Sequence, residues 1–181
     1  MPKKPSARVL GLAARSRGSE TEWSLLSRGD RVRGRLLKPA GSGPHPVIVI
    51  GGPDGRAGSP FVEAAAAAWG ARAAVITFDL PLCGSRNSDK LTALALDMRL
   101  PLARRLRAEL ELQVASDLAQ VLALIAADPE LDPARVTFAG VALGAELAKG
   151  ALSHPHPFKH VAVITASDPP ASWLREVLDH T

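Results

Sequence analysis

The sequence has few of the residues that mark secreted or metal-binding proteins. Its 181 residues include one cysteine, Cys83, and no tyrosine. A lone cysteine cannot form an internal disulfide, and no cysteine pair has the spacing of a metal site, so nothing requires an oxidising compartment. We therefore expect a cytoplasmic protein that needs no metal and no other cofactor.

Long apolar runs are also absent. The longest, residues 64–69, is far too short to span a bilayer. The segment before Ser19 is basic but lacks the continuous apolar core of a signal peptide. We therefore expect no membrane attachment. We interpret residues 1–20 as a basic, disordered tail, although their content of Arg, Ser and Ala also resembles an organellar presequence, and residues 21–181 as a single domain.

The net charge of +4 suggests nucleic-acid binding at first sight, but its distribution argues against that function. Five basic residues and no acid lie within the first eighteen positions, and the rest of the chain carries 17 basic and 18 acidic residues. A nearly neutral domain offers no basic face. The four Phe and three Trp are scattered, so no base-stacking platform is indicated. We expect no nucleic-acid partner.

Strand-like and helix-like segments alternate along the chain. Residues 23–39 contain two partly apolar segments around Arg28, Gly29 and Asp30, which predicts an antiparallel hairpin. Four short apolar runs predict buried parallel strands, and the segments after them predict helices. The fold class is therefore α/β, with a doubly wound, mostly parallel sheet of about six strands. The predicted strands are residues 46–50, 73–78, 135–139 and 159–165, and the helices 60–69, 103–127, 143–152 and 170–178.

The most informative motif joins the third of these parallel strands to its helix. It reads Gly140, Val141, Ala142, Leu143, Gly144. In a nucleophile elbow, the spacing G-x-S-x-G supplies small residues on both sides of a sharp turn that lifts the central side chain above the sheet. Here the spacing and the strand-to-helix context match, but alanine stands at the centre. The motif resembles the α/β-hydrolase superfamily, most closely its dienelactone-hydrolase-like and prolyl-oligopeptidase-like branches.

Three other segments resemble the same superfamily, so that the resemblance covers roughly residues 23–165. They are the glycine-rich GGPDG at residues 51–55, DLPLCGS at 79–85, and DPELDPARV at 128–136. The resemblance implies an oxyanion or ligand-binding site made by the backbone around Gly51, Gly52 and Pro53 together with Leu143. It also implies that Gly140 and Gly144 shape the elbow.

Two departures from the superfamily pattern bear on catalysis. Ala142 cannot attack a carbonyl, because nucleophilic catalysis needs an oxygen or sulfur atom. The superfamily also places its acid and its histidine after later strands, whereas this chain ends at Thr181, which indicates a truncated α/β-hydrolase fold. Asp168 is a weak candidate for the acid and His180 for the base. Asp168 equally suits a turn or a helix cap, and His180 a frayed terminus.

Other reactive residues have simpler interpretations. Cys83 lies in a predicted loop with no histidine paired to it, which favours a packing role. His154 and His156 alternate with prolines and have no neighbouring carboxylate, which favours a surface loop over a metal pair. The GGPDG segment at residues 51–55 lacks the residue order of a phosphate-binding loop.

The leading hypothesis is a non-catalytic α/β-hydrolase-fold protein, a pseudo-hydrolase that acts as a small-molecule-binding or protein-interaction module. Its ligand would be a small carbonyl or carboxylate compound, and the exposed edge of the sixth strand would take a second copy of the chain or another protein. The alternative is a serine esterase or hydrolase in a Ser-to-Ala or truncated form, acting on esters or related acyl substrates. A third possibility is an enzyme that uses Asp79, Cys83 or Asp168 without a triad.

Overall fold

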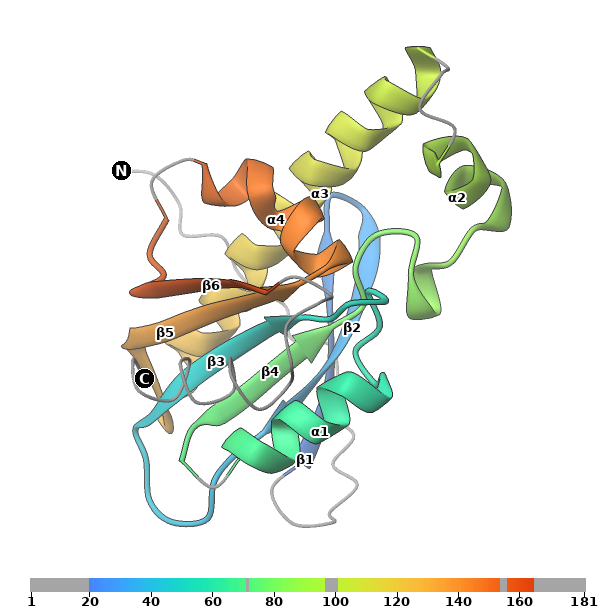
Figure 1. The fold of residues 1–181 in the computed structure, drawn as a ribbon. Helices are drawn as coiled ribbons and strands as arrows, with labels where there is room; N and C mark the ends of the chain where they lie inside the picture. The colour runs from blue at the N-terminus through green and yellow to red at the C-terminus, as the bar shows by residue number, and fades with distance from the viewer. Residues whose placement is uncertain (1–19, 71, 97–100, 154–155, 165–181) are drawn as a thin grey trace, which may run out of the picture.

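A computed structural model of the protein describes residues 20–70, 72–96, 101–153 and 156–164 (Figure 1). These residues form one six-stranded sheet in the order β1-β2-β4-β3-β5-β6. The strands are β1 (Glu20–Ser27), β2 (Asp30–Leu37), β3 (His45–Gly51), β4 (Ala74–Phe78), β5 (Leu131–Val141) and β6 (His160–Ile164). The helices are α1 (Pro60–Trp69), α2 (Asp89–Leu96), α3 (Pro101–Ala127), α4 (Leu143–Leu152) and the short 3₁₀ helix η1 (Gly84–Arg86).

Strand directions confirm the predicted sheet. The hairpin β1–β2 is antiparallel and continues antiparallel onto β4, whereas the pairs β4–β3, β3–β5 and β5–β6 are all parallel. Helix α1 covers one face of the sheet, and α3 and α4 cover the other (Figure 1). The protein is therefore a doubly wound α/β domain with an N-terminal hairpin, as the sequence indicates.

The hairpin turn follows from two residues. Arg28 and Gly29 have φ angles of 50° and 84°, the two successive positive values that a type I′ turn requires. Such a turn matches the right-handed twist of its strands. It sets the register in which Ser27 pairs with Asp30 and Trp23 pairs with Gly34.

Each face of the sheet has its own apolar core. Under α3, the buried side chains of Val114, Leu118, Val121 and Ile125 belong to the cluster that covers β2, β3, β4 and β5 on that side. Under α1, Trp69 is fully buried among strand residues of the opposite face. Burial on both faces explains why β4 consists only of buried residues and carries no polar alternation.

Helix α3 is the one described helix that is long and apolar enough to cross a membrane by length and composition. In the structure it packs against the sheet instead, with Val114, Val121 and Ile125 completely buried there. Asp117 lies on the same face and is also completely buried, in an ion pair with Arg86. This packing makes the second half of α3, from Val114 onward, part of the core of the domain.

Several element boundaries differ from the sequence expectation. Strand β5 begins at Leu131, four residues earlier than predicted, because Leu131 pairs with His45 before an irregularity in the β3–β5 ladder. The helices α2 and η1 were not predicted. The ranges of α1 and α4 are confirmed. The predicted helix at residues 170–178 and nearly all of the predicted tail lie outside the described residues.

Candidate functional site

Ala142 stands at a strained turn between β5 and α4. Its φ of 45° and ψ of −108° lie outside the regions that alanine ordinarily occupies, at a cost of about 1–3 kcal/mol. Two hydrogen bonds hold the turn: the Ala142 amide donates to the Ile164 carbonyl at 3.1 Å, and the Glu146 amide donates to the Ala142 carbonyl at 3.0 Å. The segment therefore adopts a nucleophile-elbow conformation although its central side chain is a methyl group.

The two glycines of the motif, Gly140 and Gly144, lie where a side chain would clash with neighbouring backbone. A Cβ atom on Gly144 would lie 2.1 Å from the carbonyl oxygen of Gly51, and one on Gly140 would lie 2.8 Å from the Cα of Ala145. Both distances are shorter than real Cβ contacts, so side chains are excluded at both positions. The absence of side chains lets the start of α4 approach the end of β3 closely.

This approach brings the glycine-rich loop to the elbow. Gly51 and Gly52 are buried, and the Gly55 amide donates to the Gly52 carbonyl at 3.1 Å, which closes a tight turn. No side chain caps the first amides of α4, because the N-cap residue is Ala142. Uncapped N–H groups at a helix N-terminus attract negative charge. Pro53 carries no N–H, so it can restrict the conformation of the glycine-rich loop but cannot donate a hydrogen bond to a ligand.

A pocket of about 270 Å³ lies beside Leu143. We call it the elbow pocket. Leu143 and Leu147 of α4 form one part of its lining and Leu110 of α3 another. Its polar members Arg107 and Glu146 form an ion pair with an N–O distance of 2.7 Å. The remaining lining consists of Pro81, Leu82, Cys83, Thr92 and Ala95.

Solved structures share the fold of this chain. A cold-adapted esterase from an Arctic intertidal metagenomic library superposes with a TM-score of 0.64 at 20% identity, over 85% of this chain and 65% of the esterase. The acetyl xylan esterase from Paenibacillus sp. R4 gives a TM-score of 0.65 at 20% identity, over 98% of this chain and 62% of that enzyme. The chain has an α/β-hydrolase fold.

The sequence identity to these solved structures is low, and this chain covers only part of their length. A protein assigned as a dienelactone hydrolase from Klebsiella pneumoniae gives a TM-score of 0.58 at 19% identity, over 78% of this chain and 57% of that protein. The chain thus spans less than two thirds of the length of each of these three structures. No protein-family model matches the sequence, and no curated protein matches it.

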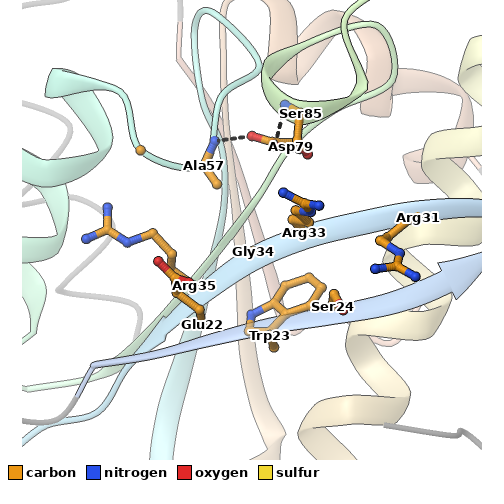
Figure 2. A pocket seen from close by; sticks show the side chains of 11 residues that line it. Glu22, Trp23, Ser24, Arg31, Arg33, Gly34, Arg35, Ala57, Asp79 and Ser85 are labelled. Atoms are coloured by element: carbon orange, nitrogen blue, oxygen red, sulfur yellow. Dashed lines mark hydrogen bonds between the residues drawn. The ribbon is translucent and has the colours of Figure 1, made fainter. Parts of the chain in front are cut away.

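Within the hydrolase fold, Asp79 fastens the loop after β4 to the loop after β3 (Figure 2). Its Oδ1 accepts from the amide of Ala57 at 2.9 Å, and its Oδ2 accepts from the amide and the hydroxyl of Ser85 at 2.8 and 2.7 Å. Gly84 must lack a Cβ for this, since one would lie 2.2 Å from Asp79 Oδ1. With its carboxylate occupied by three donors, Asp79 acts in the described structure as a positioning residue for both loops.

Cys83 packs against the same loop. A Cβ on Gly55 would lie 2.5 Å from the Cys83 Sγ, so the thiol fills the space that the glycine leaves. Burial raises the pKa of the Cys83 thiol, and the carboxylates of Asp54 and Asp79 raise it further. A raised pKa reduces the fraction of thiolate at neutral pH and therefore the reactivity of the residue. These observations agree with the packing role that the sequence favours.

A buried ionic network, which the sequence did not reveal, joins the loop after β4 to α3 and to the hairpin. The side chain of Arg86 is 2% exposed and that of Asp117 is 0% exposed. Arg86 donates from Nη1 to Asp117 Oδ2 at 2.6 Å and from Nε to Asp30 Oδ2 at 2.7 Å. Gln113 Nε2 donates to the other Asp117 oxygen at 2.8 Å. The sequence offered one indication of this network, because the acidic Asp117 lies on the same face of α3 as the apolar Val114 and Val121.

The remaining candidates from the sequence are placed only in part. Asp168, His180 and His154 lie outside the described residues. The ring of His156 lies 5.6 Å, centroid to centroid, from the ring of Phe158. Among the described residues, no group of three His, Cys, Asp or Glu side chains is arranged to hold a metal ion.

Proposed function

We propose that this protein is a non-catalytic α/β-hydrolase-fold protein that binds a small carbonyl or carboxylate compound at the elbow. The observation that carries the proposal is Ala142 at the apex of the strained turn. In an α/β hydrolase the covalent step requires an oxygen or sulfur at that apex. The methyl group of Ala142 removes that step and leaves the backbone of the site in place.

Two features support ligand binding. The uncapped amides at the start of α4 suit a carbonyl or carboxylate oxygen. The elbow pocket, with Leu110, Leu143 and Leu147 in its lining, suits a short apolar tail. Its volume of about 270 Å³ lies just below the sizes of known ligand sites for drug-sized molecules, roughly 300–1,000 Å³. We therefore expect a short-chain carboxylate or acyl compound.

Calorimetric titration with acetate, butyrate and hexanoate tests the proposal. The variant Ala95→Trp places an indole in the elbow pocket, whereas Ala93→Trp places one on an exposed position of the same helix α2. We expect butyrate and hexanoate to bind the parent and Ala93→Trp alike, and to bind Ala95→Trp at least tenfold more weakly. Absence of binding to the parent, or equal binding to both variants, would count against the proposal.

The second candidate function is a serine hydrolase disabled at one position. The retained elbow conformation favours it, because a protein without any use for the elbow gains nothing from the strain at Ala142. The substrates would be esters or related acyl compounds, as with the esterases that share the fold. Activity gained by the single change Ala142→Ser would establish this candidate.

We also propose that the edge of the sheet at β6 takes a second copy of the chain. In the described part of the chain β6 pairs with β5 alone, and an unpaired edge favours strand addition. Val161 and Val163 on β6 are 37% and 64% exposed, which adds apolar surface to that edge.

We also propose that the protein is cytoplasmic, because a reducing compartment suits the single, half-buried Cys83.

A further inference from the structure

A second pocket, of about 490 Å³, lies on the hairpin side of the molecule. Strands β1 and β2 form one wall, and residues of the loops after β3 and β4 line the other (Figure 2). We call it the arginine pocket. It shares no lining residue with the elbow pocket, so it is a separate site from the one in the proposed function.

Three arginines line the pocket from a single strand. Arg31, Arg33 and Arg35 are alternate residues of β2, so their side chains lie on one face of the sheet. The residues between and beyond them, including Val32 and Leu36, are buried on the opposite face. Figure 2 shows the three arginines along β2, with Ala57, Asp79 and Ser85 across the pocket from them.

The three arginines differ in their partners. Arg35 forms ion pairs with Glu20 and Glu63, and these pairs raise its pKa against the desolvation that lowers it. The guanidinium groups of Arg31 and Arg33 make no hydrogen bond and no ion pair within the part of the chain that the structure describes. Two neighbouring cations without a counter-ion repel each other, and a bound anion would relieve that repulsion.

Two acidic residues, Asp79 and Glu22, also line the pocket. The oxygens of Asp79 are occupied by the Ala57 amide and by Ser85. Glu22 is the other acid that lines the pocket, and it stands opposite Arg35 in the strand register. Arg31 and Arg33 therefore face the pocket without a contact to either carboxylate, although the donors to Asp79 are neutral and leave its negative charge in place.

We propose that the arginine pocket binds a small ligand through a carboxylate or phosphate group held between Arg31 and Arg33. Side chains two residues apart on a strand are about 7 Å apart at their bases, so both guanidinium groups can reach one anion. The planar fork of arginine matches the oxygens of both anions. Ser24 pairs with Arg33 in register and lines the same pocket, where its hydroxyl can add a third donor.

Calorimetric titrations with succinate and with inorganic phosphate at low ionic strength test this proposal and distinguish the two anions. The double variant Arg31→Gln/Arg33→Gln removes both pocket cations. The matched control Arg104→Gln/Arg105→Gln removes the same charge from exposed positions of α3. We expect at least one anion to bind the parent and the control within twofold of each other, and the pocket variant at least tenfold more weakly.

A third variant separates site binding from general attraction to a basic protein. Glu22→Gln removes the pocket's unoccupied carboxylate, and we expect it to tighten anion binding two- to fivefold. Failure of both anions to bind the parent, or equal loss of affinity in the pocket and control variants, would overturn the proposal. Because the elbow pocket has a different lining, this result is independent of the fatty-acid titration with Ala95→Trp.

Discussion

Gly144 lies so close to Gly51 that a Cβ atom on Gly144 would stand 2.1 Å from the Gly51 carbonyl oxygen. This contact joins the first turn of α4 to the end of β3. It places the elbow and the glycine-rich loop side by side. Ala142, whose backbone is strained, comes directly after Val141, the last residue of β5 that pairs with β6. It lies two residues before Gly144.

We predict that Gly144→Ala lowers the free energy of unfolding by about 1–3 kcal/mol, the usual cost of overpacking a close contact. Gly150→Ala on the same helix is the control, because its Cβ would meet no backbone atom but only the Glu111 side chain, with Oε2 at 3.1 Å and Cβ at 3.3 Å. That change should be neutral or stabilising by up to about 1 kcal/mol, since alanine favours helix. Urea denaturation measures both, and equal effects at the two glycines would contradict the contact.

The buried pair Arg86–Asp117 should be costly to break. We predict that Asp117→Ala lowers the free energy of unfolding by about 3–5 kcal/mol, because the charge of Arg86 is then buried without its main partner. Glu109→Ala breaks the exposed pair with Arg28 and should cost less than about 1 kcal/mol. The double variant Arg86→Met/Asp117→Leu should recover much of the loss. A loss at Asp117 no larger than that at Glu109 would show that the network is not formed.

Cys83 should react slowly with thiol reagents in the folded protein. Burial raises its pKa, so near the ordinary cysteine pKa of about 8.5 a smaller fraction of the folded thiol is ionised than of an unfolded cysteine. We predict slow labelling by Ellman's reagent at pH 7.5 and rapid labelling after unfolding in urea. Labelling of the native protein as fast as free cysteine would contradict the packing role.

The raised pKa also predicts a pH dependence of stability. Above the unfolded pKa, ionisation favours the unfolded chain, while the folded thiol remains neutral, so stability declines as pH rises from the unfolded toward the folded pKa. The parent should therefore lose more stability than Cys83→Ala between about pH 8 and pH 10. Identical pH profiles for the two proteins, measured by urea denaturation, would show that Cys83 does not contribute.

Association through β6 should depend on Val163, which is 64% exposed on the edge strand. We predict that Val163→Glu shifts the protein toward the monomer in light scattering over a series of concentrations. Leu102→Glu, at a position of α3 that is 58% exposed, should leave the distribution unchanged. A parent that remains monomeric at the highest concentration would contradict self-association.

Local patterns were sufficient to predict most of the fold and the elbow. The β-branched runs that predict the strands depend only on neighbours in sequence, and so does the glycine spacing at the elbow. The ranges of α1 and α4 were predicted correctly for the same reason. Helix α2 was missed because it has only eight residues, Asp89–Leu96.

Interactions across long stretches of sequence were beyond prediction. Arg86 and Asp117 are 31 residues apart, and only the packing of α3 against the loop after β4 brings them together. The alternation of Arg31, Arg33 and Arg35 is visible in the sequence, but the loops that complete the arginine pocket come from distant segments. The shape and the charge of the arginine pocket thus depend on tertiary contacts, whereas the backbone of the elbow depends mainly on local sequence.

Hydrolysis of a short-chain activated ester, measured for the parent and side by side for Ala142→Ser, tests most directly whether this protein is non-catalytic. Both proteins are first shown to be folded by circular dichroism. We predict no turnover by either protein above the uncatalysed rate. Turnover by the serine variant alone would instead identify a hydrolase disabled at one position. Turnover by the parent would contradict the central claim, because it would require a nucleophile other than the residue at the elbow.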